Sequence, residues 1–328
     1  MFKLRKPFSR PTTMLQAVEP DGDRSALRNS VSVVIPLYNH ARYIEETLRS
    51  AMAQGQALRE IIVVDDGSSD DSLAVAQALA LNDERLIVWS QPNQGAPAAI
   101  NHGMARATGE FIAILNSDDI FETERLATLT ALLVANPGSD LAGSGLSFIN
   151  GESQPIRDAW YEETLAVFER NRDIPLSLIE GNFLMTTSNL LFRRSLISRI
   201  GGFRNFRYAH DLDFLLRIQA YGGGIIIEPR NLMRYRRHQA NTINEQHGNV
   251  RVEWAMVAAI HLHEWMALSR QPLDARRLLA FERIFERHQL SMAVHLVLAK
   301  LRTVPIGLDG TMSILNDRAF LEIVRETV

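Results

Sequence analysis

Short apolar runs alternate with segments of helical apolar spacing along the first part of the chain. The runs are rich in β-branched residues and predict buried strands at residues 31–35, 60–64, 86–89 and 111–115. The intervening segments predict helices at residues 44–52, 68–80, 96–107 and 123–135. Pro36 is the expected end of the first strand. Such alternation is typical of an α/β fold with a mostly parallel sheet and helices on both faces.

The pattern becomes mixed between about residue 140 and residue 237. Apolar runs predict strands at residues 141–149, 190–192 and 225–227, and Pro229 is the expected end of the last one. Helical spacing predicts one helix at residues 211–221, which the three glycines that follow it should stop.

After about residue 244 the pattern is helical throughout. Two apolar stripes carry this prediction, one made by Val252, Met256, Ala259 and Ile260 and the other by Leu290, Val294, Val297 and Leu301. We therefore expect an N-terminal arm or linker at 1–29, an α/β domain at 30–243, and a C-terminal appendage of two to four helices at 244–328.

The amino-acid composition argues against several classes of function. The chain has 328 residues, of which 46% are hydrophobic and 22% charged, as in ordinary globular proteins. Its net charge of −3 argues against nucleic acid as a partner. The absence of cysteine excludes disulfides, thiol catalysis and cysteine-ligated metals, and makes the cytoplasm the default location. Lysine occurs only at Lys3, Lys6 and Lys300, none of them in a P-loop motif.

No apolar run reaches the ~18 residues that a membrane span needs. The N-terminal arm is basic but lacks the apolar region of a secretory signal. Its basic and apolar side chains would allow a peripheral contact with an anionic membrane surface, on the inner face of the membrane. A frayed terminus is the simpler interpretation, and we favour it.

Polar residues follow the first, second and fourth strands, whose carboxyl ends are where α/β sheets bind ligands. Tyr38 and Asn39 suit stacking on a base and hydrogen bonding to its edge, although turn chemistry explains them equally well. The acidic pairs at 65–66 and 118–119 suit a nucleoside and a divalent cation held with phosphates, respectively. Helix capping and an ordinary acidic turn are the alternatives. The dinucleotide fingerprint G-x-G-x-x-G is absent.

Taken in order, these segments resemble the inverting family 2 glycosyltransferases, which have the Rossmann-like GT-A fold. The resemblance rests on residues 32–39, 60–68, 93–95, 101–103, 107–110, 116–119, 187–194, 200–203, 209–211, 235–238 and 241–242. It covers about residues 30 to 243. It implies a nucleotide-binding half at 30–139 and an acceptor-binding half at 140–243.

The resemblance also implies roles for single residues. Those expected to bind the nucleotide are Pro36, Tyr38, Asn39, Asp65, Asp66, Asn93, Gly95, Ser117 and Asp118. Those expected beside the sugar or diphosphate are Asp119, His210, Arg236, Arg237 and His238. Asp118 and His238 would bind Mn²⁺ or Mg²⁺. Asp211 would be the general base that deprotonates the acceptor hydroxyl.

Two positions depart from the family pattern. Asn116 replaces the usual first carboxylate of the metal motif, which leaves Asp118 as the main ligand and puts metal affinity in doubt. His210 replaces the usual acid before Asp211. A histidine there would act either as a neutral hydrogen-bond partner or as a group that titrates near neutral pH. A Q-x-x-R-W motif is missing after Asp211, which argues against a processive, membrane-embedded synthase.

The function expected is metal-dependent transfer of a sugar, with inversion, from a nucleotide-diphospho-sugar to a hydroxyl of a glycan or glycolipid. A UDP- or dTDP-sugar donor and a place in bacterial surface polysaccharide synthesis are favoured. The alternatives are a nucleotidyltransferase or hydrolase on the same sheet, and a non-catalytic scaffold of a polysaccharide-assembly complex. The sequence leaves a homodimer open.

Overall fold

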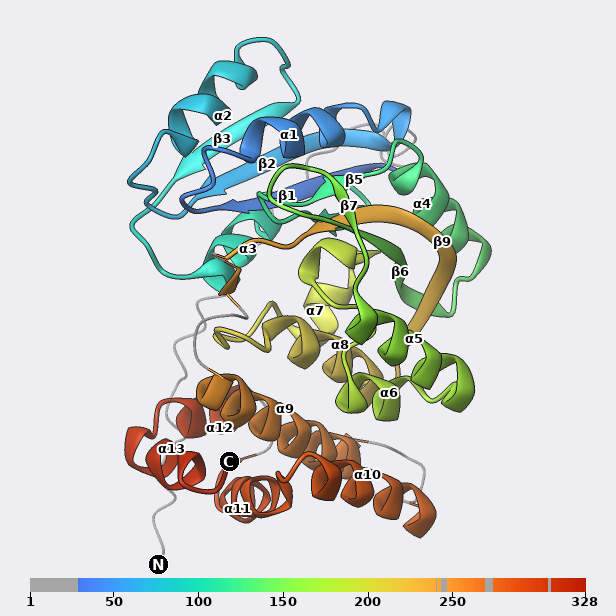
Figure 1. Ribbon diagram of the computed structural model, residues 1–328, viewed down its shortest axis with the longest axis vertical. Coiled ribbons are helices and arrows are strands. Elements are labelled where there is room, and N and C mark those ends of the chain that lie inside the picture. The colour runs from blue at the N-terminus through green and yellow to red at the C-terminus, as the bar shows by residue number, and fades with distance from the viewer. Residues whose placement is uncertain (1–28, 240, 243–246, 269–273, 306–307) are drawn as a thin grey trace, which may run out of the picture.

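The structure is a computed structural model that describes residues 29–239, 241–242, 247–268, 274–305 and 308–328 (Figure 1). The arm predicted at 1–29 lies outside the described residues except for Asn29, and so does most of the boundary predicted near 243. The strands are β1 Val31–Leu37, β2 Leu58–Asp65, β3 Leu86–Ser90, β4 Phe111–Ile114, β5 Ile120–Phe121, β6 Ser139–Ile149, β7 Pro155–Ile156, β8 Leu191–Arg193 and β9 Gly224–Arg236.

The helices cover the sheet and form a separate layer beyond it (Figure 1). In the α/β part they are α1 Ile44–Met52, α2 Ser72–Ala80, α3 Ala96–Met104, α4 Arg125–Ala135, α5 Ala159–Asn171, α6 Ile174–Glu180, α7 Leu196–Ile200 and α8 His210–Ala220. Two short 3-10 turns, Gly55–Ala57 and Thr187–Asn189, complete this part. The C-terminal helices are α9 His247–Leu268, α10 Ala275–Arg287, α11 Ser291–Leu301, α12 Leu308–Leu315 and α13 Arg318–Arg325.

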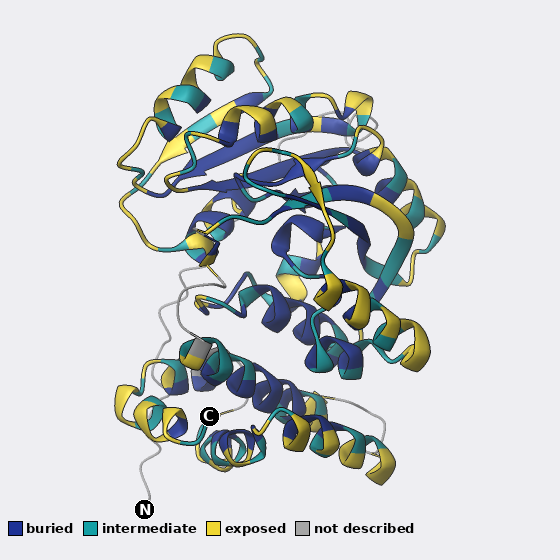
Figure 2. Ribbon diagram, in the orientation of Figure 1, coloured by how far each residue is buried: buried dark blue, intermediate teal, exposed yellow. Residues whose placement is uncertain are grey.

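The first half of the sheet confirms the predicted α/β pattern. Strands β3, β2, β1 and β4 are parallel neighbours in that order. Alternate side chains of β1 enter two cores: Val33 and Ile35 pack with α1 and α4, whereas Val34 packs with α3. Strands β1 and β4 are therefore buried on both faces (Figure 2), which explains why they appear in the sequence as unbroken apolar runs, whereas the edge strand β3 is partly exposed.

The prediction that Pro36 ends β1 is wrong. The strand runs to Leu37, and Pro36 pairs with Val64 of β2. Pairing of β1 with β4 stops at Val34, two residues earlier. Because alternate residues of a strand hydrogen-bond to opposite neighbours, the missing N–H of Pro36 lies on the side where no ladder remains.

The second half of the sheet is mixed. Strand β8 is antiparallel to both β4 and β6, and β9 is parallel to β6. The prediction that Pro229 ends a strand is wrong, because β9 continues to Arg236. The pairing register shifts between Ser144 and Gly145 of β6, which leaves Pro229 outside the regular ladder. Gly145 allows the close approach, because a Cβ there would lie only 2.9 Å from the Pro229 carbonyl oxygen. Helices α5, α6 and α7 and the two-residue strands β5 and β7 were not predicted.

The predicted C-terminal helical region is confirmed, but its described part holds the five helices α9 to α13 rather than two to four. Helix α9 lies between α8 and α11, so residues 255–262 are buried on every side (Figure 2). Among the helices that the structure describes, none combines the length and hydropathy needed to cross a bilayer.

Candidate active site

Three ligand-type side chains meet at the carboxyl edge of the sheet. His40 follows β1, Asp118 follows β4 and His238 follows β9. One ligand atom from each lies within 4.8 Å of the others. His238 Nε2 lies 2.9 Å from Asp118 Oδ2, and His40 Nδ1 lies 2.8 Å from the Ser117 hydroxyl. The structure therefore brings together two residues expected as metal ligands, Asp118 and His238, and adds His40.

The electrostatics of this cluster suit a cation. Burial raises the pKa of Asp118, but the hydrogen bond from His238 and the charges of His40 and His238 outweigh it, so the pKa lies below its usual range. Burial lowers the pKa of His40, which favours the neutral imidazole that binds metals. An ionised carboxylate and a neutral imidazole are thus available at neutral pH.

His40 was missed by sequence reasoning. The nucleotide-binding residues expected in this segment ended at Asn39, one residue before it. The available signal was its place: it stands three residues after the first strand, at the same sheet edge as Asp118, and histidine is the commonest metal ligand.

Asp119 is placed differently from expectation. Its side chain is fully buried, and its oxygens accept hydrogen bonds from the Ser188 hydroxyl at 2.6 Å and the Arg236 backbone N–H at 2.9 Å. Burial and the charge of Asp118 raise its pKa well above the usual range. Asp119 therefore joins β4 to β9 and does not reach a surface where a sugar would bind.

Arg236 is also placed differently from expectation. Its guanidinium is fully buried and donates to Glu46 at 2.6 Å, to the Asp118 carbonyl at 2.7 Å and to the Ser153 hydroxyl at 2.8 Å. With its donors used inside the protein, it cannot neutralise a bound phosphate in this conformation. Arg237 pairs with Asp158 and keeps a partly exposed guanidinium.

The residues expected to bind the nucleoside divide into exposed and buried groups. Tyr38, Asn39 and Asn93 are exposed beyond the ends of β1 and β3. Pro36, Asp65, Asp66 and Ser117 are buried. Three of the expected side chains thus lie at the surface of this sheet edge.

The buried aspartates shape the loop that the exposed residues occupy. Asp66 accepts hydrogen bonds from the Gln91 side chain at 2.7 Å and the Gly95 backbone N–H at 2.7 Å. Asp65 accepts from the Ser90 hydroxyl at 2.9 Å. Gly95 has φ +88°, which favours glycine, and immediately precedes α3. The two carboxylates therefore fix the segment between β3 and α3.

Asp211 stands in the first turn of α8 and is 8% exposed. Its carboxylate accepts hydrogen bonds from the Asn182 amide at 2.8 Å and its neighbouring Leu212 N–H at 2.7 Å. Burial raises the pKa of Asp211 to about 6. A carboxylate with a raised pKa, still ionised at neutral pH, has the properties of a general base.

His210 beside it is neutral at neutral pH. Burial lowers the pKa of His210 to about 4, and its Nδ1 has no hydrogen-bond partner among the described residues. Of the two alternatives for this histidine, the structure favours a neutral partner over a group that titrates near pH 7.

Residues 182–189 connect the metal-ligand cluster to Asp211. At one end of this segment Asn182 donates to Asp211. At the other end the Ser188 hydroxyl contacts Asp119 and the Asn116 backbone N–H. The candidate base and the cluster are thus held by one short stretch of chain.

Residues 32–201 match the family model "Glycosyl transferase family 2". The chain belongs to this family.

Its relatives are also glycosyltransferases by name. An uncharacterized glycosyltransferase of Nostoc sp. is 30% identical over 218 residues, 64% of this chain and 66% of the relative. Glycosyltransferase GlyG of Streptococcus pneumoniae is 41% identical over 100 residues, 30% of this chain and 33% of GlyG. The matched region is therefore less than two thirds of each relative.

A solved structure shares the fold of this family 2 chain. TarS of S. aureus, residues 1–349 in complex with UDP-GlcNAc, superposes with a TM-score of 0.55 at 17% identity, covering 91% of this chain and 90% of that chain. The likeness supports the GT-A assignment and extends over the C-terminal helices.

Asn116, the departure from the family 2 metal motif, has a structural role. Its amide donates to the Thr186 hydroxyl and accepts from the Thr187 hydroxyl, both at 2.9 Å. An aspartate could only accept, so the Thr186 hydroxyl would have to donate in its place. The third ligand-type side chain of the cluster is His40 instead.

Proposed function

We propose that this chain is a metal-dependent inverting glycosyltransferase that transfers a sugar from a nucleotide-diphospho-sugar to an acceptor hydroxyl. The observation that carries the proposal is the pairing of two sites: the His40–Asp118–His238 cluster and the buried carboxylate of Asp211. A transferase of this class needs a diphosphate-binding end and a base.

The cluster fits a divalent cation. Two imidazoles and one carboxylate suit Mn²⁺ better than Mg²⁺, which prefers oxygen ligands. A cation held there would offset the charge of the leaving diphosphate. Arg237, one residue before His238, is partly exposed and pairs with Asp158, and we propose that it adds positive charge near the diphosphate.

In the proposed reaction the Asp211 carboxylate accepts the proton of the acceptor hydroxyl as that oxygen bonds to the anomeric carbon. The bond from that carbon to the diphosphate oxygen breaks in the same displacement, so the configuration inverts. Asn182 holds one carboxylate oxygen of Asp211 and thereby sets the direction in which the proton is taken. No covalent enzyme nucleophile is required.

Further details belong to the same proposal. Tyr38, Asn39 and Asn93 would contact the base, within a nucleotide-binding half at 30–139. Residues 140–243 would form the acceptor-binding half. The fold shared with TarS, solved with UDP-GlcNAc, supports a uridine donor. The acceptor hydroxyl would belong to a glycan or glycolipid.

A thermal-shift screen tests the proposal. UDP, GDP, dTDP and CMP are each added with and without Mn²⁺, since a ligand at about 100 times its Kd adds roughly 2.7 kcal/mol of stability. We expect one nucleotide, UDP first, to raise the Tm, and Mn²⁺ to enlarge the shift. The variant Asp118→Asn should lose the enlargement. If no nucleotide shifts the Tm, the proposal fails and a non-catalytic scaffold replaces it.

A further inference from the structure

The C-terminal helical region touches the segment that carries the candidate base. The Glu253 carboxylate of α9 accepts hydrogen bonds from the backbone N–H groups of Arg207, Tyr208 and Ala209, at 2.9, 2.7 and 3.0 Å. These three residues directly precede His210 and Asp211. One side chain from α9 therefore holds the chain where it enters α8.

The sequence gives this entry no cap of its own. The residue before α8 is Ala209, which has no side-chain acceptor, and no side-chain cap bond forms there. Helix entries usually gain a Ser, Thr, Asp or Asn at this place. Glu253 instead accepts from the N–H groups that directly precede the helix, and it comes from another helix, 44 to 46 residues further along the chain.

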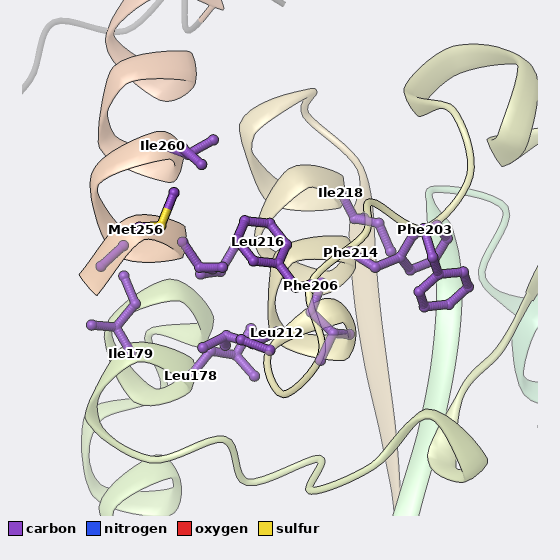
Figure 3. Close-up of a cluster of buried hydrophobic side chains, with 14 of the residues drawn as sticks. Leu178, Ile179, Phe203, Phe206, Leu212, Phe214, Leu216, Ile218, Met256 and Ile260 are labelled. Atoms are coloured by element: carbon purple, nitrogen blue, oxygen red, sulfur yellow. The ribbon is translucent and has the colours of Figure 1, made fainter. Parts of the chain in front are cut away.

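Helix α9 is firmly attached to α8. Figure 3 shows Met256 and Ile260 of α9 on the side facing Leu216 of α8, within one buried cluster. Glu253, Met256, Ile260 and Glu264 recur at helical spacing and share one face of α9. This face presents an acid at each end and apolar side chains between them.

The second acid of this face closes a buried ion network. Glu264 pairs with Arg204, which also contacts Asp213 of α8 at 2.9 Å. Asp213 in turn contacts Arg217 at 2.8 Å. All four side chains are at most 3% exposed. Because unpairing a buried charge is costly, the network keeps α9 in register with α8.

We propose that Glu253 is a positioning residue for sugar transfer, which makes α9 a working part of the active site rather than an appendage. By fixing residues 207–209, it sets the place of the Asp211 carboxylate against the acceptor hydroxyl. The inference rests on the proposed role of Asp211 as base.

The charges around Glu253 are consistent with this positioning role. Burial raises the pKa of Glu253, and its backbone hydrogen bonds and the positive charge of Arg207 offset only part of that rise. Asp211 is the other charged group that faces Glu253. Burial is the main cause of the raised pKa of Asp211, and the negative charge of Glu253 raises it further. Removing that charge should therefore lower the pKa of Asp211. The single amide oxygen of a glutamine keeps only part of the hydrogen bonding that the two carboxylate oxygens provide.

Three variants separate these effects. Glu253→Ala removes the acceptor, Glu253→Gln keeps an acceptor oxygen without the charge, and Glu286→Gln, on an exposed position of α10, is the matched control. Thermal melts first identify variants that stay folded. Hydrogen–deuterium exchange then follows residues 206–213. Carboxyl ¹³C NMR, with Asp211 assigned by its loss in Asp211→Asn, follows the titration of the base.

We expect faster exchange at residues 207–209 in Glu253→Ala, partial restoration in Glu253→Gln, and a lower Asp211 pKa in Glu253→Gln. With the donor found in the nucleotide screen, kcat should fall roughly tenfold to a hundredfold in Glu253→Ala while the donor KM stays unchanged, since misplacement of a catalytic group by 1 Å costs about that much. Glu286→Gln should match the wild type in every measurement.

Two failures are distinguishable. If the wild type transfers sugar and Glu253→Ala keeps its kcat, or if residues 207–209 exchange as slowly in Glu253→Ala as in the wild type, the positioning role of Glu253 is wrong. If the wild type turns over no donor, the proposed function fails, while the exchange and titration measurements still decide whether Glu253 holds this segment.

Discussion

His238 Nε2 lies 2.9 Å from Asp118 Oδ2, although 120 residues separate the two along the chain. The contact joins the ends of β9 and β4 at one sheet edge, and His40 completes the cluster from the end of β1. If this cluster is the proposed metal site, changing any one of its three side chains should weaken cation binding.

Replacing His40 by alanine should weaken Mn²⁺ binding by at least about tenfold, comparable to the loss of a metal-supporting residue. The same is expected for His238→Ala. Titration of Mn²⁺ followed by electron paramagnetic resonance measures the Kd. His295→Ala, at an exposed position on α11, is the control. Unchanged affinity in His40→Ala would remove this histidine from the site.

Asp211→Asn should keep donor binding and lose transfer by about 10²- to 10⁴-fold, the usual contribution of a general base. The asparagine can still accept the hydrogen bond from Asn182, so the local structure should persist. Nucleotide-dependent thermal shifts report binding, and release of the nucleoside diphosphate reports turnover. Near-normal turnover would assign the base elsewhere.

The pH profile should follow the same carboxyl. Since Asp211 acts in its ionised form and burial raises its pKa to about 6, kcat should be level above about pH 7 and fall about tenfold per pH unit below about pH 6. The measurement is the rate at saturating donor between pH 5 and 8. A profile that stays level to pH 5 would contradict the assignment.

The raised pKa also predicts a stability effect. A carboxyl with a higher pKa in the folded protein, about 6 against 3.8, stabilises the fold when protonated and loses that contribution as pH rises through about 6. Asp211→Asn should therefore be more stable than the wild type by about 2–3 kcal/mol at pH 7, with little difference at pH 4. Urea denaturation at both pH values measures it, and an equal gap at both would contradict the linkage.

Arg236→Ala should destabilise the protein by about 3 kcal/mol or more, because it leaves buried carbonyl and hydroxyl groups without their donor. Arg237→Ala, which removes a partly exposed ion pair, should cost much less. Denaturant unfolding of both variants makes the comparison. Similar stability of the two would restore a ligand-binding role for Arg236.

Local spacing predicted the parallel half of the sheet well, because strands buried on both faces leave unbroken apolar runs such as that of β1. It failed at Pro36 and Pro229, where the outcome depends on which neighbour strand still pairs and on a register shift in β6. The extent of pairing with the neighbouring strand and the register shift both depend on residues far from the proline in sequence, so the local pattern could not predict them.

The same limit applies to the site. Motif order placed Asp118 and His238 together, but it did not distinguish a carboxylate that faces a ligand from one that fastens two strands, as Asp119 does. That distinction depends on Ser188 and Arg236, which come from other parts of the chain. The hold of Glu253 on residues 207–209 has no sequence signal either, because it depends on how α9 docks.

The ligands at residues 40, 118 and 238 also bear on how the molecule folds. No two of them are neighbours in sequence, so no local fragment carries a precursor of the cluster, and contacts of such separation form late because loop closure must come first. The cluster is complete only when β9 has joined the sheet beside β6. The time course of Mn²⁺ binding during refolding would then report the final assembly step. No Mn²⁺ would bind at this cluster before β9 joins the sheet.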